Sequence, residues 1–272
     1  MQPRLLLRAP EELCHGRLKR IGEGIGKVVY ASDHWVVKRE RSNHEVISLI
    51  VLWKLIRRFR RLLPSRAVRF LRVVVQSLLV LVPKSLWYES HVRELWRNYR
   101  RADIRGEYLA QAHLAGTGLV PERITFPPTQ LRVGGWPGWL VASEATERVE
   151  ATLHDRLGEL ARKGQFQEIE TWIDRFLELR QAGWQRGVFS VDAHLKNYGV
   201  SGDRVVLIDA GGLTNRWADI EKRLTFEDVI GEPHIQLGLG PVLGARPDLA
   251  DRFDARWKAI VSPAGVRAHW PD

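Results

Sequence analysis

The segment SVDAHLKNYGVSGDRVVLIDAGG, residues 190–212, places two carboxylates and an amide within one short stretch of chain. Asn197 follows Asp192 by five positions, and Asp209 ends the apolar run RVVLID directly before the small residues AGG. A carboxylate at the end of a buried strand, with glycines after it, is expected at the edge of a cleft where the backbone is open. Such a group can hold Mg²⁺, which binds through one or two carboxylates together with substrate phosphates.

The composition indicates a globular protein of one large domain or two lobes, because 272 residues are enough to bury a sizeable core. The single cysteine, Cys14, excludes a disulfide framework and a cysteine-rich zinc site. It fits a reducing compartment, so we expect a cytoplasmic protein. The run LLL near the N-terminus is too short for a secretory signal.

Positive charge is concentrated in one part of the chain. The net charge is +10, and residues 39–101 hold 15 Lys or Arg against 4 Asp or Glu. Within residues 44–82, apolar residues recur at helical spacing and basic residues fill the opposite face, with a break at Pro64. This asymmetry indicates an anionic partner, namely a phospholipid surface, a nucleic acid or a phosphorylated substrate.

The order of the other expected elements predicts an α+β fold with two lobes. The β-branched and aromatic runs KVVYA and HWVVK predict strands around a turn within residues 17–38. A Gly/Pro turn separates two further strands in residues 123–145. Helices are expected at 104–115, 150–163 and 166–183, ahead of the small β segment that carries the aspartates.

The stretch DAHLKN has the form D-x-H-x-x-N, and LIDAGG follows with its Asp209 twelve residues after Asn197. Together they resemble the catalytic and metal-binding loops of the protein-kinase-like fold. This variant is similar to aminoglycoside and choline phosphotransferases, and to the bacterial lipopolysaccharide core kinases and their relatives. The resemblance implies that Asp192 orients an acceptor hydroxyl and accepts its proton, and that Asn197 and Asp209 hold Mg²⁺.

The resemblance continues upstream in the same order along the chain. GEGIGKVVY resembles the glycine-rich loop that covers the nucleotide phosphates, and VVK resembles the strand whose lysine pairs with the α- and β-phosphates. EYLAQAHLAGTGLVPERI resembles the helix whose Glu107 would pair with Lys38, and WLVASEA resembles the hinge that meets adenine. The implied ATP-binding residues are Gly22, Gly24, Gly26, Lys38 and Glu144, and the implied catalytic residues are Asp192, Lys38 and Glu107.

The implied fold is a two-lobed protein-kinase-like fold, with an N-lobe at residues 1–146 and a mostly helical, short C-lobe at residues 147–272. A basic amphipathic helical insertion occupies residues 43–101 of the N-lobe. Some residues depart from the family pattern. Ser190 and Val191 replace the His and Arg before the catalytic Asp, and Ala210 replaces the Phe after the metal-binding Asp.

We therefore expect an ATP- and Mg²⁺-dependent phosphotransferase that moves the γ-phosphoryl group to a hydroxyl group. The expected acceptor is a sugar on a membrane glycolipid such as lipopolysaccharide core, because about 60 residues after Gly212 leave little platform for a peptide. Three alternatives remain open. They are a protein Ser/Thr kinase-like enzyme, a nucleotide-binding pseudokinase that serves as a scaffold at the membrane, and a nucleic-acid-binding protein.

The basic insertion itself has three interpretations: a surface that binds an anionic membrane, a subdomain packed on the N-lobe, or a nucleic-acid-binding element. Arg69 and Arg72 interrupt the second apolar stretch, so it is not a clean membrane span. A basic amphipathic pair suits the plane of an anionic interface. Aromatic residues that could stack on bases are few, which disfavours nucleic acid. We expect the protein at the inner face of the membrane, bound peripherally.

Replacing Arg57, Arg58, Arg60 and Arg61 with Gln should reduce binding to anionic vesicles, because each basic residue near an anionic surface contributes about 1 kcal/mol. The wild-type protein should sediment with such vesicles and detach as salt rises, since salt screens exposed charges. Turnover of a soluble acceptor analogue should be unchanged in the variant. Equal binding of the wild type to neutral and anionic vesicles, or no binding to either, would contradict the membrane interpretation.

Overall fold

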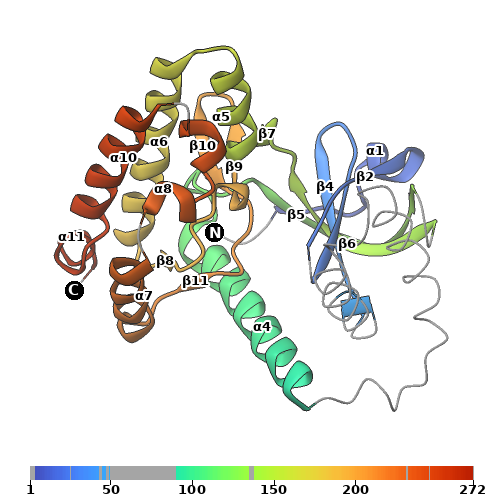
Figure 1. The fold of residues 1–272 in the computed structure, drawn as a ribbon. Helices are drawn as coiled ribbons and strands as arrows, with labels where there is room; N and C mark the ends of the chain where they lie inside the picture. The colour runs from blue at the N-terminus through green and yellow to red at the C-terminus, as the bar shows by residue number, and fades with distance from the viewer. Residues whose placement is uncertain are drawn as a thin grey trace, which may run out of the picture. The chain divides into compact units, whose positions relative to one another are not determined.

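The structure, a computed structural model, describes residues 4–24, 26–42, 45–46, 49, 90–134, 138–230, 232–244 and 246–271 (Figure 1). The chain forms two compact units. The helical unit comprises Met1–Leu5, Arg101–Ile124 and Thr146–Asp272. The sheet unit comprises Leu6–Arg100 and Thr125–Ala145. Of the basic amphipathic insertion expected at residues 43–101, residues 43–44, 47–48 and 50–89 lie outside the described residues.

The sheet unit begins with a short helix, α1 (Glu11–His15), and three antiparallel strands: β2 (Arg17–Glu23), β3 (Lys27–Ala31) and β4 (Trp35–Glu40). The runs KVVYA and HWVVK form β3 and β4, and the expected turn joins them, with the Ser32 amide donating to the Trp35 carbonyl at 2.9 Å. One face of these strands is core, because Val28, Tyr30 and Val37 are each 1% exposed. Residues of the opposite face alternate with them along each strand.

Strands β5 (Arg123–Val133) and β6 (Trp139–Glu147) confirm the two strands expected at residues 123–145. The strand order is β1-β5-β2-β3-β4-β6, where β1 is Arg4–Leu5, and β6 also pairs with β5. The β2–β5 pair is parallel, with Arg17 opposite Arg132. Strands β5, β2, β3, β4 and β6 therefore form a closed ring of hydrogen-bonded strands.

The helical unit is built on α5 (Leu153–Arg162) and α6 (Phe166–Trp184), which confirm the helices expected at 150–163 and 166–183. Leu153, Leu157 and Leu160 recur at helical spacing, are at most 1% exposed, and share one core with apolar residues of α6. In Figure 1, α10 runs beside α6, and Arg252 of α10 pairs with Glu170 of α6 at 3.1 Å. The C-terminal helices are α7 (Trp217–Ile230), α8 (Pro233–Gln236), α9 (Gly240–Leu243), α10 (Pro247–Ile260) and α11 (Pro263–Arg267).

Two small sheets carry the aspartate segment. The hairpin of β9 (Tyr198–Ser201) and β10 (Arg204–Leu207) pairs with β7 (Ala151–Thr152), while β8 (Phe189–Ser190) pairs with β11 (Leu213–Thr214). A single 3₁₀ turn, η4 (Leu195–Asn197), precedes β9. Val205, Val206 and Leu207 of β10 are buried, as the run RVVLID predicted. Asp209 therefore lies two residues beyond the end of a buried strand.

The helix expected at 104–115 is the second half of a longer helix, α4 (Ser90–Leu109), which continues into a π-helical turn, η3 (Ala110–Leu114). Its first turns are rich in Arg, so the sequence pattern assigned them to the basic insertion. The predicted division at residue 146 groups residues 101–124 with the strands, whereas the compact units group them with the C-terminal helices. This end of α4 packs on the aspartate segment through Gly106, where a Cβ would lie 1.8 Å from the Ala210 carbonyl oxygen.

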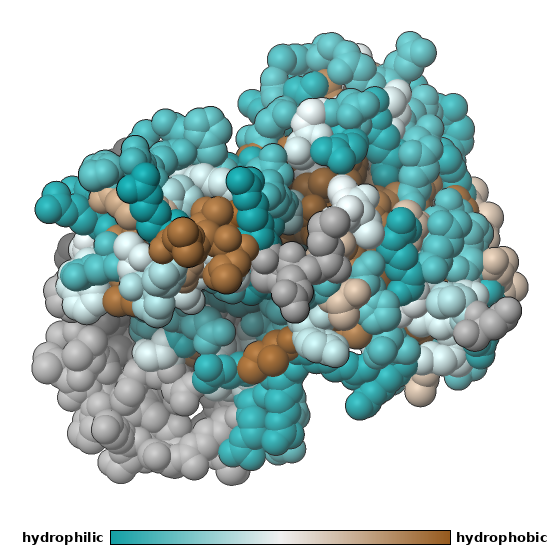
Figure 2. Space-filling view, turned by 180° about the vertical axis from the view of Figure 1, so that it is seen from behind, coloured by the Kyte–Doolittle hydropathy of each residue, from teal (hydrophilic) through white to brown (hydrophobic). Residues whose placement is uncertain are grey.

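The fold belongs to the α+β class. Figure 2 shows hydrophilic residues over most of one face, with apolar residues in scattered patches. Scattered apolar residues are normal on a globular surface. Among the described residues, no helix combines the length and the apolar character that crossing a membrane requires.

Gly106→Ala should destabilise the protein, although Ala normally favours a helix over Gly by about 1 kcal/mol. The added methyl group would collide with the backbone of Ala210, and overpacking of this kind costs about 1–3 kcal/mol. Gly158→Ala in α5 is the matched control and should raise stability, because an added Cβ there has no neighbour within 4 Å. Urea unfolding measures both effects. A Gly106→Ala protein as stable as Gly158→Ala would contradict the packing of α4 on Ala210.

Candidate functional site

The loop of Asp192 lies directly against the loop that follows Asp209. The β8–β11 pair sets Ser190 opposite Leu213, and the Val191 amide donates to the Gly212 carbonyl at 2.8 Å. At Gly212 a Cβ would lie 3.0 Å from both the amide nitrogen and the Cβ of Asp192. A side chain at position 212 would therefore push the two loops apart, and glycine allows their contact.

Asn197 joins the same two loops through both its side chain and its backbone. Its Nδ2 donates to the Asp192 carbonyl at 3.2 Å. Its own carbonyl accepts hydrogen bonds from the amides of Ile208 at 2.9 Å and Asp209 at 3.2 Å. The structure thus brings together Asp192, Asn197 and Asp209, which the sequence predicted as one site.

The two aspartates are exposed, and backbone amides hold one oxygen of each. Asp192 Oδ1 accepts from the His194 amide at 3.3 Å, and Asp209 Oδ1 accepts from the Gly211 amide at 3.1 Å. Aspartate makes such bonds in ordinary turns as well. What distinguishes this pair is that Asn197 is hydrogen-bonded to both loops, so that two carboxylates and an amide, the kinds of oxygen ligand that Mg²⁺ prefers, belong to adjoining loops.

Arg180 of α6 supports the Asp192 loop at both of its ends, and the sequence analysis did not select it. Its side chain is buried, and its Nη1 donates to the Ser190 carbonyl at 2.9 Å and to the Tyr198 hydroxyl at 3.2 Å. Its guanidinium lies 4.8 Å from the centre of the Phe189 ring, and an aromatic face stabilises a cation at that distance. The only sequence signal was a charged residue at an apolar position of a predicted helix.

His194 stabilises the Asp192 loop. Its Nδ1 accepts from the Lys196 amide at 3.2 Å, and its ring packs on Gly238, where a Cβ would lie 2.8 Å from the ring. Burial lowers the pKa of His194, and the positive charges of Lys196 and His154 lower it further, against the opposite effect of Asp192. A neutral His194 with Nδ1 as acceptor carries its proton on Nε2.

The acidic residue that α4 presents to the Asp209 loop is Asp103. Asp103 is buried, and its Oδ1 lies 3.0 Å from the position that a Cβ on Gly211 would take. Asp209 Oδ1 lies 3.3 Å from that same position, so the two carboxylates flank Gly211. Glu107, the residue that the sequence selected on this helix, forms an ion pair with Arg123 at 3.6 Å. Its predicted pairing with Lys38 stays a prediction.

In the sheet unit, Lys38 and Gly22, the first of the predicted phosphate-binding glycines, share one row of the sheet. Gly22 lies opposite Val29 on β3, and Val29 lies opposite Lys38 on β4. Directly opposed residues point to the same face of a sheet, and two strand spacings put Lys38 about 10 Å from Gly22. Val36 shares this half-buried face, because it is two residues from Lys38 on the same strand.

Neither conformation nor packing within the sheet unit accounts for Gly22 and Gly24. Neither has a positive φ, and the nearest atoms to an added Cβ are 3.8 Å away at Gly22 and 4.0 Å away at Gly24. Gly26 is different, because a Cβ there would lie 3.0 Å from the Tyr99 ring and 3.2 Å from the Trp96 ring. Among the described residues, nothing therefore lies closely against the missing side chains of Gly22, on β2, and of Gly24, directly after it.

Glu144, the residue predicted for the adenine hinge, lies exposed on β6.

A scan of the chain against protein-family models found no match, and a search among curated proteins found no similar sequence. Among the described residues there is no group of three or more His, Cys, Asp or Glu side chains suited to a metal ion. The metal donors that the sequence predicts are one carboxylate, Asp209, and one amide, Asn197, and Mg²⁺ binds proteins through one or two carboxylates together with substrate phosphates.

His194→Asn should reduce the loss of stability on acidification. Because the folded-state pKa of His194 is lowered, the unfolded chain binds a proton more readily, so wild-type stability falls as pH drops from about 7 to about 5. Asn offers an acceptor for the Lys196 amide but has no such proton to bind. Urea unfolding at the two pH values gives the difference for each protein. An equal loss of stability in the wild type and in His194→Asn would contradict a lowered folded-state pKa of His194.

Proposed function

We propose that this protein is an ATP- and Mg²⁺-dependent phosphotransferase with a two-lobed protein-kinase-like fold, which moves the γ-phosphoryl group of ATP to a hydroxyl group. The observation that carries the proposal is the convergence of Asp192, Asn197 and Asp209 in the helical unit. Phosphoryl transfer depends on positioning and on electrostatic stabilisation. These residue types match the three groups that it needs: a general base, an amide that binds the metal and a carboxylate that binds the metal.

Each residue of this set has a separate role. Asp209 and Asn197 would hold Mg²⁺, which neutralises charge on the transferred phosphoryl group when it is bound. Asp192 orients the acceptor hydroxyl and accepts its proton, since its carboxylate is exposed and fixed by the His194 amide. Asn197 fixes the loops of Asp192 and Asp209 relative to each other, because it is hydrogen-bonded to both.

The sheet unit offers features that suit ATP. A glycine-containing turn joins the first two strands of an antiparallel meander, and a lysine lies on the third, which is the order of these parts in protein kinases. The open backbone at Gly22 and Gly24 gives phosphate oxygens close access. Lys38 adds a cation, and the half-buried Val29 and Val36 offer an apolar surface for adenine beside it.

The proposed acceptor is a hydroxyl group of a lipid-linked sugar, reached by peripheral binding to the inner face of the membrane. The basic segment at residues 39–101 supports this choice. A second candidate is a nucleotide-binding pseudokinase, which Ser190 and Val191 favour because they occupy the positions of the usual His and Arg. A protein Ser/Thr acceptor is the other alternative.

Asp209→Ala should abolish Mg²⁺-dependent turnover, with a loss of at least about 100-fold because metal stabilisation of the transferred phosphoryl group disappears. Asp192→Asn should leave MgATP binding nearly intact and remove transfer, because Asp192 acts on the acceptor. Asp203→Asn, an exposed residue in the β9–β10 turn, is the matched control and should behave as wild type.

The measurements are calorimetric titration with MgATP and transfer of radiolabel from γ-labelled ATP to lipid, sugar and protein fractions. The labelled fraction identifies the acceptor class. Normal MgATP turnover in Asp209→Ala would contradict the phosphotransferase assignment. Nucleotide binding by the wild type without transfer to any fraction would favour the pseudokinase.

A further inference from the structure

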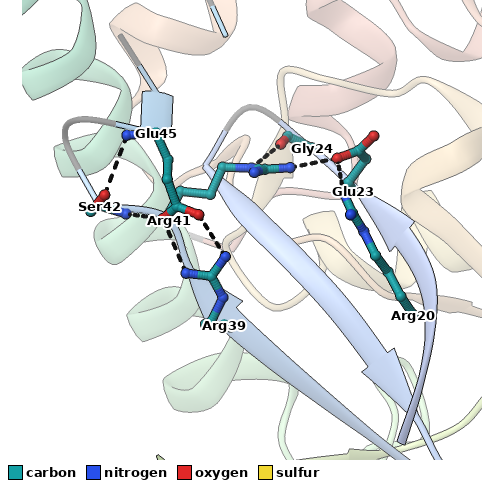
Figure 3. A network of polar contacts seen from close by, with 7 residues as sticks. All are labelled: Arg20, Glu23, Gly24, Arg39, Arg41, Ser42 and Glu45. Carbon is teal, nitrogen blue, oxygen red and sulfur yellow. Dashed lines mark hydrogen bonds and ion pairs between the residues drawn. The ribbon is translucent and has the colours of Figure 1, made fainter. Parts of the chain in front are cut away.

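A single arginine, Arg41, contacts the glycine turn of the sheet unit at three positions, and Figure 3 shows two of them, Glu23 and Gly24. Its Nη2 donates to Glu23 Oε2 at 2.6 Å, and its Nε donates to the Gly24 carbonyl at 3.1 Å. Its backbone amide donates to the Gly26 carbonyl at 2.7 Å. Arg41 directly follows β4 and is 7% exposed, so it lies beneath the turn and is largely removed from solvent.

These contacts restrict a segment that would otherwise be mobile. Glycine loses more conformational freedom on ordering than any other residue. Three hydrogen bonds from the buried Arg41 fix the side chain of Glu23 and the carbonyl groups of Gly24 and Gly26. The stacked rings of Trp96 and Tyr99, with centroids 5.4 Å apart, pack on Gly26 from α4.

Glu23 places a negative charge within this turn, and two guanidinium groups neutralise it. Figure 3 shows its carboxylate between Arg20 and Arg41, with an ion pair to each. A carboxylate without such partners would repel an incoming phosphate. With them, the three side chains together carry a positive charge, which favours an anion beside the open backbone of Gly22 and Gly24.

We propose that Arg41 is a positioning residue for the nucleotide phosphates. It holds the Glu23 side chain and the carbonyl groups of Gly24 and Gly26 in place for the phosphates, and it neutralises Glu23. This inference rests on the proposed function, since it takes ATP as the ligand of the turn. A binding segment that is already ordered in the free protein binds more tightly, because the free-energy cost of ordering it no longer reduces the binding free energy.

Arg39 provides a matched comparison two residues earlier in the chain. Its guanidinium donates to both oxygens of Glu45, at 3.0 and 2.7 Å. Burial opposes ionisation of Glu45, yet the hydrogen bonds from Arg39 and the Ser42 amide lower the pKa of Glu45 to about 2. The Ser42 hydroxyl accepts from the Glu45 amide in return, which is the pattern of a helix capping box. Arg39 thus makes an equally well-formed ion pair with a partner outside the glycine turn.

The experiment compares Arg41→Met, Arg41→Lys and the control Arg39→Met in the full-length protein. Amide hydrogen exchange of the turn reports its order without nucleotide, and calorimetric titration reports MgATP affinity. Arg41→Met should exchange at least about tenfold faster at the turn and bind MgATP about tenfold more weakly than Arg39→Met, because it loses two hydrogen bonds of a charged donor. The KM for ATP should rise more than kcat falls.

Arg41→Lys should be impaired nearly as much, because a single ammonium nitrogen cannot replace the two guanidinium nitrogens that donate to Glu23 and to Gly24 at the same time. It also carries the test if Arg41→Met fails to fold. MgATP affinity equal to that of Arg39→Met, in a wild type that binds MgATP, would overturn the role of Arg41 and leave the proposed function standing. A wild type that does not bind MgATP would overturn the proposed function and the nucleotide role together. Unchanged exchange at the turn would overturn the restraint itself.

Discussion

Contact between backbones without intervening side chains is the constraint on which the aspartate site depends. A Cβ at Gly106 of α4 would lie 1.8 Å from the Ala210 carbonyl oxygen, which no side chain can tolerate, and a Cβ at Gly212 would lie 3.0 Å from Asp192, so that the neighbouring loop would have to shift. Each contact brings a different part of the chain onto the short segment 209–212. The loop of Asp192 and the end of α4 therefore approach Asp209 from two directions. The hydrogen bonds of Asn197 then fix the arrangement, but glycine first makes the approach possible.

Local patterns predicted the parts of the structure that depend on near neighbours in the sequence. The buried strand before Asp209, helices α5 and α6, and the strands around residues 123–145 follow from hydrophobic periodicity and turn residues. The order of Asp192, Asn197 and Asp209 also predicted their proximity, because all three belong to one compact β segment. The start of α4 was not predicted, since its charged first turns continue the composition of the basic insertion.

Partners that are distant in sequence could not be read from these patterns. Arg180 supports Ser190 from the interior of a helix, and Asp103 reaches Gly211 across more than 100 residues. Glu107 and Asp103 are one helical turn apart, so a shift of four residues decides which carboxylate meets the aspartate segment. Only the tertiary structure selects between them. The contacts of Arg41 with the glycine turn belong to the same class, since they arise where β4 ends beside the turn that joins β2 to β3.

The closed ring of strands has a consequence for the way in which other macromolecules can associate with the sheet unit. Within the described residues, β2, β3, β4 and β6 each have hydrogen-bonded neighbours on both sides. Strand β3 pairs along both of its sides, with β2 and with β4. An extended peptide therefore cannot add to the sheet at β3, although such addition is a common route to both recognition and aggregation. Association through β3 must rely on its side chains.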